Sequence, residues 1–181
     1  MMTRRLLFAW FLLCVPFVTS AWAADAISVE AGYGYHTDMA RLSWSRAWDA
    51  RWFADSPWYL SGYWDVGLGR WTPHNPAGGN HDVTDFGLTP VWRLRPSGPL
   101  SPISPFLEAA VGVHYISDHQ IYNGRDMSTH FQFGDHVGAG VSFGEHHDWD
   151  LMARLQHLSN AGLKNPNPGI NFYQIRLSHW Y

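Results

Sequence analysis

The sequence predicts an all-β protein, an eight-stranded antiparallel transmembrane β-barrel, and three observations lead to this fold class. Apolar and polar residues alternate along eight segments, each about as long as the ~9–11 residues that a tilted membrane-crossing strand needs. Aromatic residues make up 16% of the chain and charged residues only 15%, which fits a bilayer-facing wall bordered by aromatic girdles. An even number of strands closes the sheet, so that no unpaired edge is left in the membrane.

The eight expected strands are separated by residues that favour turns. The separators at 73–79, 96–99 and 144–148 contain Pro, Gly, Asn, Asp and Ser in turn-forming combinations. No internal repeat or linker interrupts the pattern, so residues 24–181 are expected to form a single outer-membrane barrel domain. In chain order, the expected strands cover approximately residues 27–35, 39–48, 57–68, 82–93, 104–115, 130–143, 148–157 and 171–181.

The alternation is clearest in two of these segments. In segment 104–115, Val111 lies on an apolar face and Glu108 on the opposite face. In the last segment Arg176 likewise alternates with apolar neighbours, so both charged residues are expected in a polar barrel interior. The chain ends on Tyr181, and an alternating final strand that ends in an aromatic residue resembles the C-terminal signal of bacterial outer-membrane barrels. The alternative is a soluble β-sandwich in the periplasm.

The N-terminus has the order of a secretory signal peptide. Two arginines precede an apolar run at 6–18, and small residues then lead to Ala23. We expect cleavage after Ala23, so that residues 1–23 are the signal peptide; an uncleaved anchor is the alternative. Cys14 is the one cysteine of the chain and lies in this segment, so the mature protein cannot depend on disulfides for stability.

The charge balance argues against a nucleic-acid partner. The formal net charge is −3 at pH 7, and loss of the two arginines with the signal peptide brings it near −5. Lys164 is the sole lysine, whereas nucleic-acid binding needs clustered basic residues. The histidines match no compact ligand spacing, so no metal is expected.

The residues that can carry chemistry stand near the C-terminus. His157 and Ser159 are two apart, so in a strand they project from the same face. Leu151 and Leu155 share that face, which places the pair on the apolar, lipid-facing side. A histidine can remove the proton that keeps a serine weakly nucleophilic. This placement predicts ester hydrolysis on a lipid; the alternative is a histidine beside a turn serine, without a catalytic role.

Five motifs, in order along the chain, resemble those of one known family. The motif at 157–164 reads His-Leu-Ser-Asn-Ala-Gly-Leu-Lys and is similar to the signature of the PagL family of lipid A 3-O-deacylases. Further matches lie at 61–67, 105–109, 133–140 and 166–170. The resemblance implies an eight-stranded barrel of the bacterial outer membrane, with a serine hydrolase site that faces the outer leaflet. The implied reaction hydrolyses the 3-position acyl ester of lipid A and releases a 3-hydroxy fatty acid without a cofactor.

The resemblance also implies roles for individual residues. His157 corresponds to the general base and Ser159 to the nucleophile, while Asn160 and the backbone of Gly162 correspond to oxyanion donors. The family completes its triad with a glutamate twelve residues after the serine, where this chain has Asn171. An asparagine can orient the imidazole by accepting a hydrogen bond, but it supplies no negative charge.

A second acid is available if the segments around residue 146 form a hairpin. With Phe143 opposite Trp149, Asp135 faces His157 from the neighbouring strand, and opposed Cβ atoms lie ~4.5–5.5 Å apart. A carboxylate on a lipid-facing wall is costly and needs a partner. We therefore expect Asp135 to assist or replace the missing glutamate; a purely structural carboxylate in the interior or at the rim is the alternative.

The remaining expectations concern partners. Lys164 and Arg125 are expected to contact lipid phosphates, because anionic headgroups attract basic residues at the membrane rim; the alternative is that they are merely solvated. The expected partners are lipid A or lipopolysaccharide as substrate, the outer-membrane lipids, and the barrel-assembly machinery during insertion. A homodimer stays open.

Two other classes of function also stay open. The absence of an acid at Asn171 is compatible with a catalytically inactive barrel that has a structural or lipid-binding role. An adhesin-type barrel would bind ligands through its outer loops, although the loops at 36–38 and 116–129 look short. A lipid A acyltransferase is a further variant, which would add an acyl chain rather than remove one.

Overall fold

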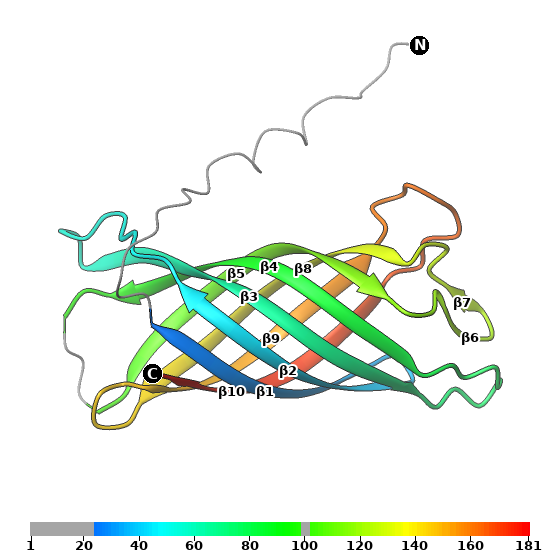
Figure 1. Ribbon diagram of the computed structural model, residues 1–181, viewed down its shortest axis with the longest axis horizontal. Helices are drawn as coiled ribbons and strands as arrows, with labels where there is room; N and C mark the ends of the chain where they lie inside the picture. The colour runs from blue at the N-terminus through cyan, green and yellow to red at the C-terminus, as the bar shows by residue number, and fades with distance from the viewer. Residues whose placement is uncertain (1–23, 99–101) are drawn as a thin grey trace, which may run out of the picture.

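The computed structural model describes residues 24–98 and 102–181. It shows one closed barrel of eight antiparallel strands (Figure 1), which confirms the predicted fold class. The signal peptide expected at 1–23 lies outside the described residues. In chain order the barrel strands are β1 (Asp25–Gly34), β2 (Thr37–Ala47), β3 (Trp58–Pro73), β4 (Val83–Pro96), β5 (Ser104–Ile116), β8 (Phe131–Phe143), β9 (Trp149–Ser159) and β10 (Ile170–Trp180).

Each expected segment overlaps one of these strands, but β3 and β4 are longer than expected. Inward and outward residues keep alternating to the end of β3, but the polarity of the inward face changes: Leu68 faces out and is 58% exposed, whereas the apolar Trp71 is fully buried inside the barrel. An apolar residue on the inward face breaks the apolar-out pattern from which the strand end was predicted. The strand nevertheless continues to Pro73, paired with Thr37 of β2.

The connection between β5 and β8 contains a small hairpin that was not expected. It is formed by β6 (Gln120–Tyr122) and β7 (Arg125–Asp126). The start of β1 and the end of β10 lie at one end of the barrel, while this hairpin and the loop between β9 and β10 lie at the other (Figure 1). We call the second end the loop end. No helix in the described part of the chain is long and apolar enough to cross a membrane.

The barrel wall is apolar outside and polar inside. Val111 and Ile175 face out and are more than half exposed, whereas Glu108 and Arg176 are 4% and 2% exposed. The predicted interior position of both charged residues is therefore confirmed. Such an inside-out distribution suits a strand whose outer face meets lipid.

The interior charges are paired, as their removal from water requires. Each buried arginine of the described residues lies against at least one buried carboxylate. The pairs are Arg154–Glu30 at 2.6 Å, Arg176–Asp65 at 2.5 Å and Arg93–Glu108 at 2.5 Å, together with Arg41–Asp85.

At the loop end the polar interior gives way to an apolar cluster. The β6–β7 hairpin contributes side chains that pack against residues at the ends of the barrel strands. This cluster therefore supports the loop end from inside the barrel. Its members are Met39, Trp71, Val83, Ile116, Ile121, Tyr122, Met127, Leu158, Ile170 and Phe172.

Candidate active site

The last residues of β9 place His157 and Ser159 on the outward face at the loop end. Burial alternates along the strand: Gln156 and Leu158 are buried in the barrel, whereas His157 and Ser159 are half-buried on the outside. Leu155, two residues earlier on the same face, is 41% exposed. The shared lipid-facing side expected from the alternation is therefore present in the structure.

The neighbouring strand orients the imidazole. Asn171 of β10 lies directly opposite His157, and its Oδ1 lies 2.6 Å from His157 Nδ1. An amide oxygen only accepts hydrogen bonds, so Nδ1 is the donor and carries the proton. In the neutral imidazole, Nε2 is then the nitrogen that can accept a proton, as a general base requires.

A close approach of the backbone confines the other side of the ring. Gly169 has a φ of +58°, and a Cβ built there would lie 2.6 Å from His157 Cε1 and 3.2 Å from its Nε2. Both the left-handed conformation and the missing side chain are therefore needed for the loop to lie against the imidazole. The motif at 166–170 contains Gly169, but its contact with the imidazole was not expected; a glycine at the end of the Asn-Pro-Asn-Pro-Gly segment was the available signal.

Asp135 of β8 occupies the predicted position. Phe143 pairs with Trp149 and Asp135 with His157, which confirms the register expected from the hairpin. The residue is exposed on the outward face, so Asp135, His157 and Asn171 form one row across three strands. Among the described hydrogen bonds none joins Asp135 to His157, whose Nδ1 is bonded to Asn171.

Ser159 completes the candidate pair at the end of β9, opposite Phe133 of β8. Residues two apart on a strand are separated by about 6.6 Å along its axis. No hydrogen bond joins Ser159 to His157 in the described part of the chain, and catalytic hydrogen bonds often tighten only when substrate binds. The candidate nucleophile and base therefore share one face of β9 but are not hydrogen-bonded to each other.

The two expected oxyanion donors are engaged within the loop. Asn160 is fully buried, and its Nδ2 donates to Met127 O at 3.0 Å and to Lys164 O at 2.8 Å. The Gly162 N–H donates to Asn160 Oδ1 at 2.9 Å. Either group must exchange its present partner before it can bind an oxyanion. By contrast, the Ala161 N–H has no hydrogen-bond partner among the described residues.

The two basic residues expected at the membrane rim differ in their surroundings. Lys164 is exposed on the β9–β10 loop. Arg125 is half-buried: its Nε donates to the Tyr122 hydroxyl at 2.6 Å, and its Nη1 donates to the Gly169 carbonyl. Arg125 therefore touches the same glycine that lies against His157.

An apolar groove of about 440 Å³ lies on the outward face of β1, β8, β9 and β10. It begins two residues before His157 along β9. Small residues at its base, such as Ala31 and Ala153, lie between larger flanking side chains. The apolar side chains at its sides are Tyr33, Val137, Leu155, Tyr173 and Ile175.

Comparisons with known proteins identify the family. The family model described as lipid A 3-O-deacylase (PagL) matches residues 38–180. The chain belongs to the PagL family. The lipid A deacylase PagL of Pseudomonas aeruginosa is 34% identical over 158 residues, which cover 87% of each chain. The lipid A deacylase PagL of Bordetella bronchiseptica is 34% identical over 76 residues, which cover 42% of this chain and 41% of its own.

A solved structure agrees with this assignment. The crystal structure of the outer membrane enzyme PagL matches with a TM-score of 0.74 at 29% identity, over 85% of this chain and 98% of that one. The resemblance that the motifs indicated is thus confirmed. Within the PagL pattern the departure is Asn171, which lies at hydrogen-bond distance from the imidazole where the implied glutamate would act.

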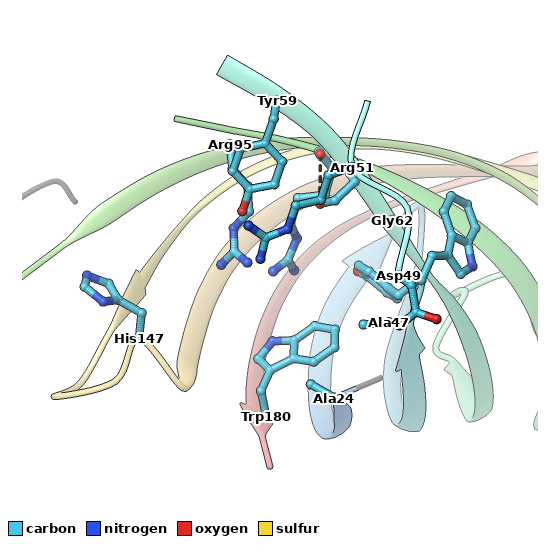
Figure 2. Close-up of a pocket in the computed structure, with 13 residues that line it drawn as sticks. Ala24, Ala47, Asp49, Arg51, Tyr59, Gly62, Arg95, His147 and Trp180 are labelled. Atoms are coloured by element: carbon cyan, nitrogen blue, oxygen red, sulfur yellow. Dashed lines mark hydrogen bonds between the residues drawn. The ribbon is translucent and has the colours of Figure 1, made fainter. Parts of the chain in front are cut away.

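A second hollow lies at the opposite end of the barrel from the PagL motif. It has a volume of about 350 Å³, and Figure 2 shows Arg51 and Arg95 directed into it, with Trp180 and Ala24 nearby. None of the predicted catalytic residues lines it. Arg95 donates to Ser142 at 2.5 Å, so the hollow is the mouth of the polar, hydrogen-bonded interior. In the described residues no group of His, Cys, Asp or Glu side chains is arranged to hold a metal ion.

Proposed function

We propose that this protein is a serine-type lipid A 3-O-deacylase, which removes the 3-position acyl chain of lipopolysaccharide. The observation that carries the proposal is the 2.6 Å hydrogen bond between His157 Nδ1 and Asn171 Oδ1, on the same face as Ser159. It leaves Nε2 free to accept a proton. Membership of the PagL family supports lipid A as the substrate.

The reaction proceeds in two halves. Ser159 Oγ attacks the ester carbonyl while His157 Nε2 takes the hydroxyl proton; the tetrahedral intermediate then collapses and expels the sugar 3-oxygen, which receives that proton from His157. His157 next deprotonates a water molecule, which attacks the acyl-enzyme. The 3-hydroxy fatty acid leaves, and Ser159 Oγ recovers its proton.

Backbone donors of the β9–β10 loop stabilise the oxyanion. One such donor is usually worth about 2.7–4 kcal/mol in the transition state. Among the described residues the Ala161 N–H has no hydrogen-bond partner, whereas Asn160 and Gly162 donate once the loop exchanges their present partners. A small rearrangement on substrate binding therefore completes the oxyanion hole.

The lipid-facing position of the site gives a lipid substrate direct access to Ser159. An acyl chain that lies in the apolar groove beside Leu155 places its ester near Ser159 without leaving the bilayer. The loop end faces the outer leaflet in this account, because lipid A resides there. Lys164 and the remaining N–H groups of Arg125 are then close to the lipid phosphates.

Asn171 can orient the His157 imidazole as a carboxylate would, but it carries no negative charge. In a triad whose aspartate becomes asparagine, turnover falls by ~10⁴, largely because the imidazole takes the wrong tautomer. Here the Asn171 oxygen accepts from Nδ1, so the tautomer is the productive one. What is missing is a negative charge, and Asp135 on the other flank of His157 provides it through space.

The test is mass spectrometry of lipid A from cells that express the wild-type protein or Ser159→Ala. Wild-type cells are expected to lose one 3-hydroxyacyl chain, and the variant cells to keep it. Both proteins must be found folded in the outer membrane. Identical spectra under those conditions would overturn the proposal in favour of an inactive barrel, and a gained acyl chain would indicate an acyltransferase.

A further inference from the structure

We propose that Arg125 is a positioning residue of this site, which holds His157 in its productive orientation through Gly169. The proposal rests on the deacylase function proposed above. It extends that function to the β6–β7 hairpin, which contains none of the residues of the Ser159 motif. Three features of the described residues support it: the packing of the hairpin, its hydrogen bonds to the β9–β10 loop, and the geometry of Arg125.

The hairpin packs directly behind the site. Ile121 and Met127 are fully buried in the apolar cluster at the loop end, and Tyr122 is 3% exposed. Leu158 and Ile170, which belong to the same cluster, are the inward-facing neighbours of His157 and Asn171. The backbone that carries the base and its orienting residue is therefore supported from inside by the hairpin.

Hydrogen bonds connect the hairpin segment to the β9–β10 loop at three points. Ser128 Oγ donates to the Pro166 carbonyl at 2.7 Å. Asn160 Nδ2 donates to the Met127 carbonyl at 3.0 Å. Arg125 Nη1 donates to the carbonyl of Gly169. Of the three, the last reaches the residue that lies against the imidazole.

Arg125 is itself held in a defined orientation. Its Nε donates to the Tyr122 hydroxyl, and its guanidinium stacks 5.5 Å from the centre of the Tyr35 ring and 5.7 Å from that of Tyr122. A planar guanidinium can make these contacts together, because its N–H groups point in fixed directions. A lysine keeps the charge but cannot donate to Tyr122 and Gly169 in the same geometry.

The effect on His157 follows from the Gly169 contact. A Cβ at Gly169 would be 2.6 Å from His157 Cε1, so the glycine backbone forms one wall of the imidazole site. If the carbonyl loses its donor, this wall can move away and the ring can leave the Asn171 oxygen. The chain of contacts runs from Arg125 through Gly169 to His157 and Asn171.

The segment that follows Arg125 is fixed by Asp126. Its carboxylate accepts from the Ser128 N–H at 2.7 Å and lies 2.7 Å from His119 Nδ1. Partial burial alone would raise the pKa of Asp126, but the Ser128 N–H and His119 stabilise the carboxylate and hold its pKa below the ordinary value. Arg125 is thus presented by a loop with internal hydrogen bonds rather than by a mobile tip.

The decisive variant is Arg125→Lys, because it separates positioning from headgroup attraction. We expect kcat on purified lipid A to fall about tenfold or more, because a misplacement of about 1 Å can cost ~10² in rate. KM should stay within about twofold of the wild-type value. Gly169→Ala should lower kcat in the same way. Arg70→Lys is the matched control: Arg70 is at the same end, ion-paired with Asp82, and should leave both constants unchanged.

A second readout tests the same proposal without turnover. The ¹⁵N chemical shifts of the His157 ring, measured in detergent micelles, should report Nδ1–H in the wild type and a mixture of tautomers in Arg125→Lys. An unchanged tautomer with unchanged kcat would overturn the proposal, as would a loss confined to KM, which indicates a headgroup contact. If the wild type itself were inactive, the proposed function would fail while the tautomer measurement still decided the role of Arg125.

Discussion

At the scale of residues, His157 is held between neighbours of three kinds. Asn171 fixes the tautomer through a hydrogen bond, Gly169 fixes the ring by contact, and Asp135 lies opposite on β8 without a hydrogen bond. These separate tasks explain how a chain without the implied glutamate can retain the pattern of a hydrolase. In the proposed mechanism, orientation and charge, which one carboxylate normally supplies together, come from different strands.

Replacement of the orienting residue tests this division. Asn171→Glu adds a negative charge at a position that already accepts from His157 Nδ1, so kcat should rise about 10–100-fold. The rise stays below ~10⁴ because the tautomer is already productive. Asn171→Ala should lower kcat. Rates of fatty-acid release from lipid A by the folded proteins measure both effects. Equal rates for wild type and Asn171→Ala would show that Asn171 has no part in orientation.

The contribution of Asp135 is tested by removal of its charge alone. Asp135→Asn should lower kcat about tenfold, or about 1.4 kcal/mol, because the imidazolium formed in the transition state loses an opposed carboxylate. Asp38→Asn removes an exposed carboxylate from the start of β2 and serves as the control. If Asp135→Asn retains full activity while the barrel is folded, its carboxylate is structural.

At the scale of elements, the strands were predictable because each presents one face to lipid. The β8–β9 register was predictable as well, since a short turn and matched alternation permit few pairings. The inward-facing end of β3 and the β6–β7 hairpin were not predictable in this way. Their apolar residues, such as Trp71 and Ile121, point into the barrel mouth, where the lipid-facing rule does not apply.

The residues of the site were likewise predictable only where a sequence pattern marks them. His157, Ser159 and their orienting residue are close in sequence or belong to a motif, so the pattern of residues indicated them. Gly169 and Arg125 act through a contact and a carbonyl hydrogen bond between distant segments. Such contacts depend on the packed loop end and leave no periodic signal in the chain.

The hairpin should loosen at acid pH. The pKa of Asp126 is lowered in the folded protein, so its stabilising effect is present above the ordinary carboxyl value of about 3.9 and is lost as pH falls through the lower, folded value. We expect the hydrogen-exchange protection of the Ser128 amide, corrected for the intrinsic rate, to be constant from pH 7 to about 5 and to decrease below about 4.

Two comparisons make this prediction specific to the hairpin. Asp126→Asn should give low protection at every pH, without the acid transition, because the amide cannot act as the charged acceptor. The Val111 amide of β5 should stay protected, since it belongs to the barrel wall. An acid transition that persists in Asp126→Asn would assign it to another group.

At the scale of the whole molecule, the barrel separates two environments for polar groups. Its interior pairs arginines with carboxylates, while the proposed catalytic pair lies on the lipid-facing outer wall. In the proposed function, a lipid substrate therefore reaches the site laterally. The apolar cluster at the loop end joins both regions, because it packs against the inner face of the strands that carry the site.

The proposed function depends above all on Ser159 acting as a nucleophile that His157 activates. The most direct measurement exposes the folded protein in detergent to an alkyl fluorophosphonate and locates the adduct by peptide mass spectrometry. We predict a single adduct on Ser159 in the wild type and none in His157→Ala. No adduct on the folded wild type, or one that forms equally in His157→Ala, would contradict the claim.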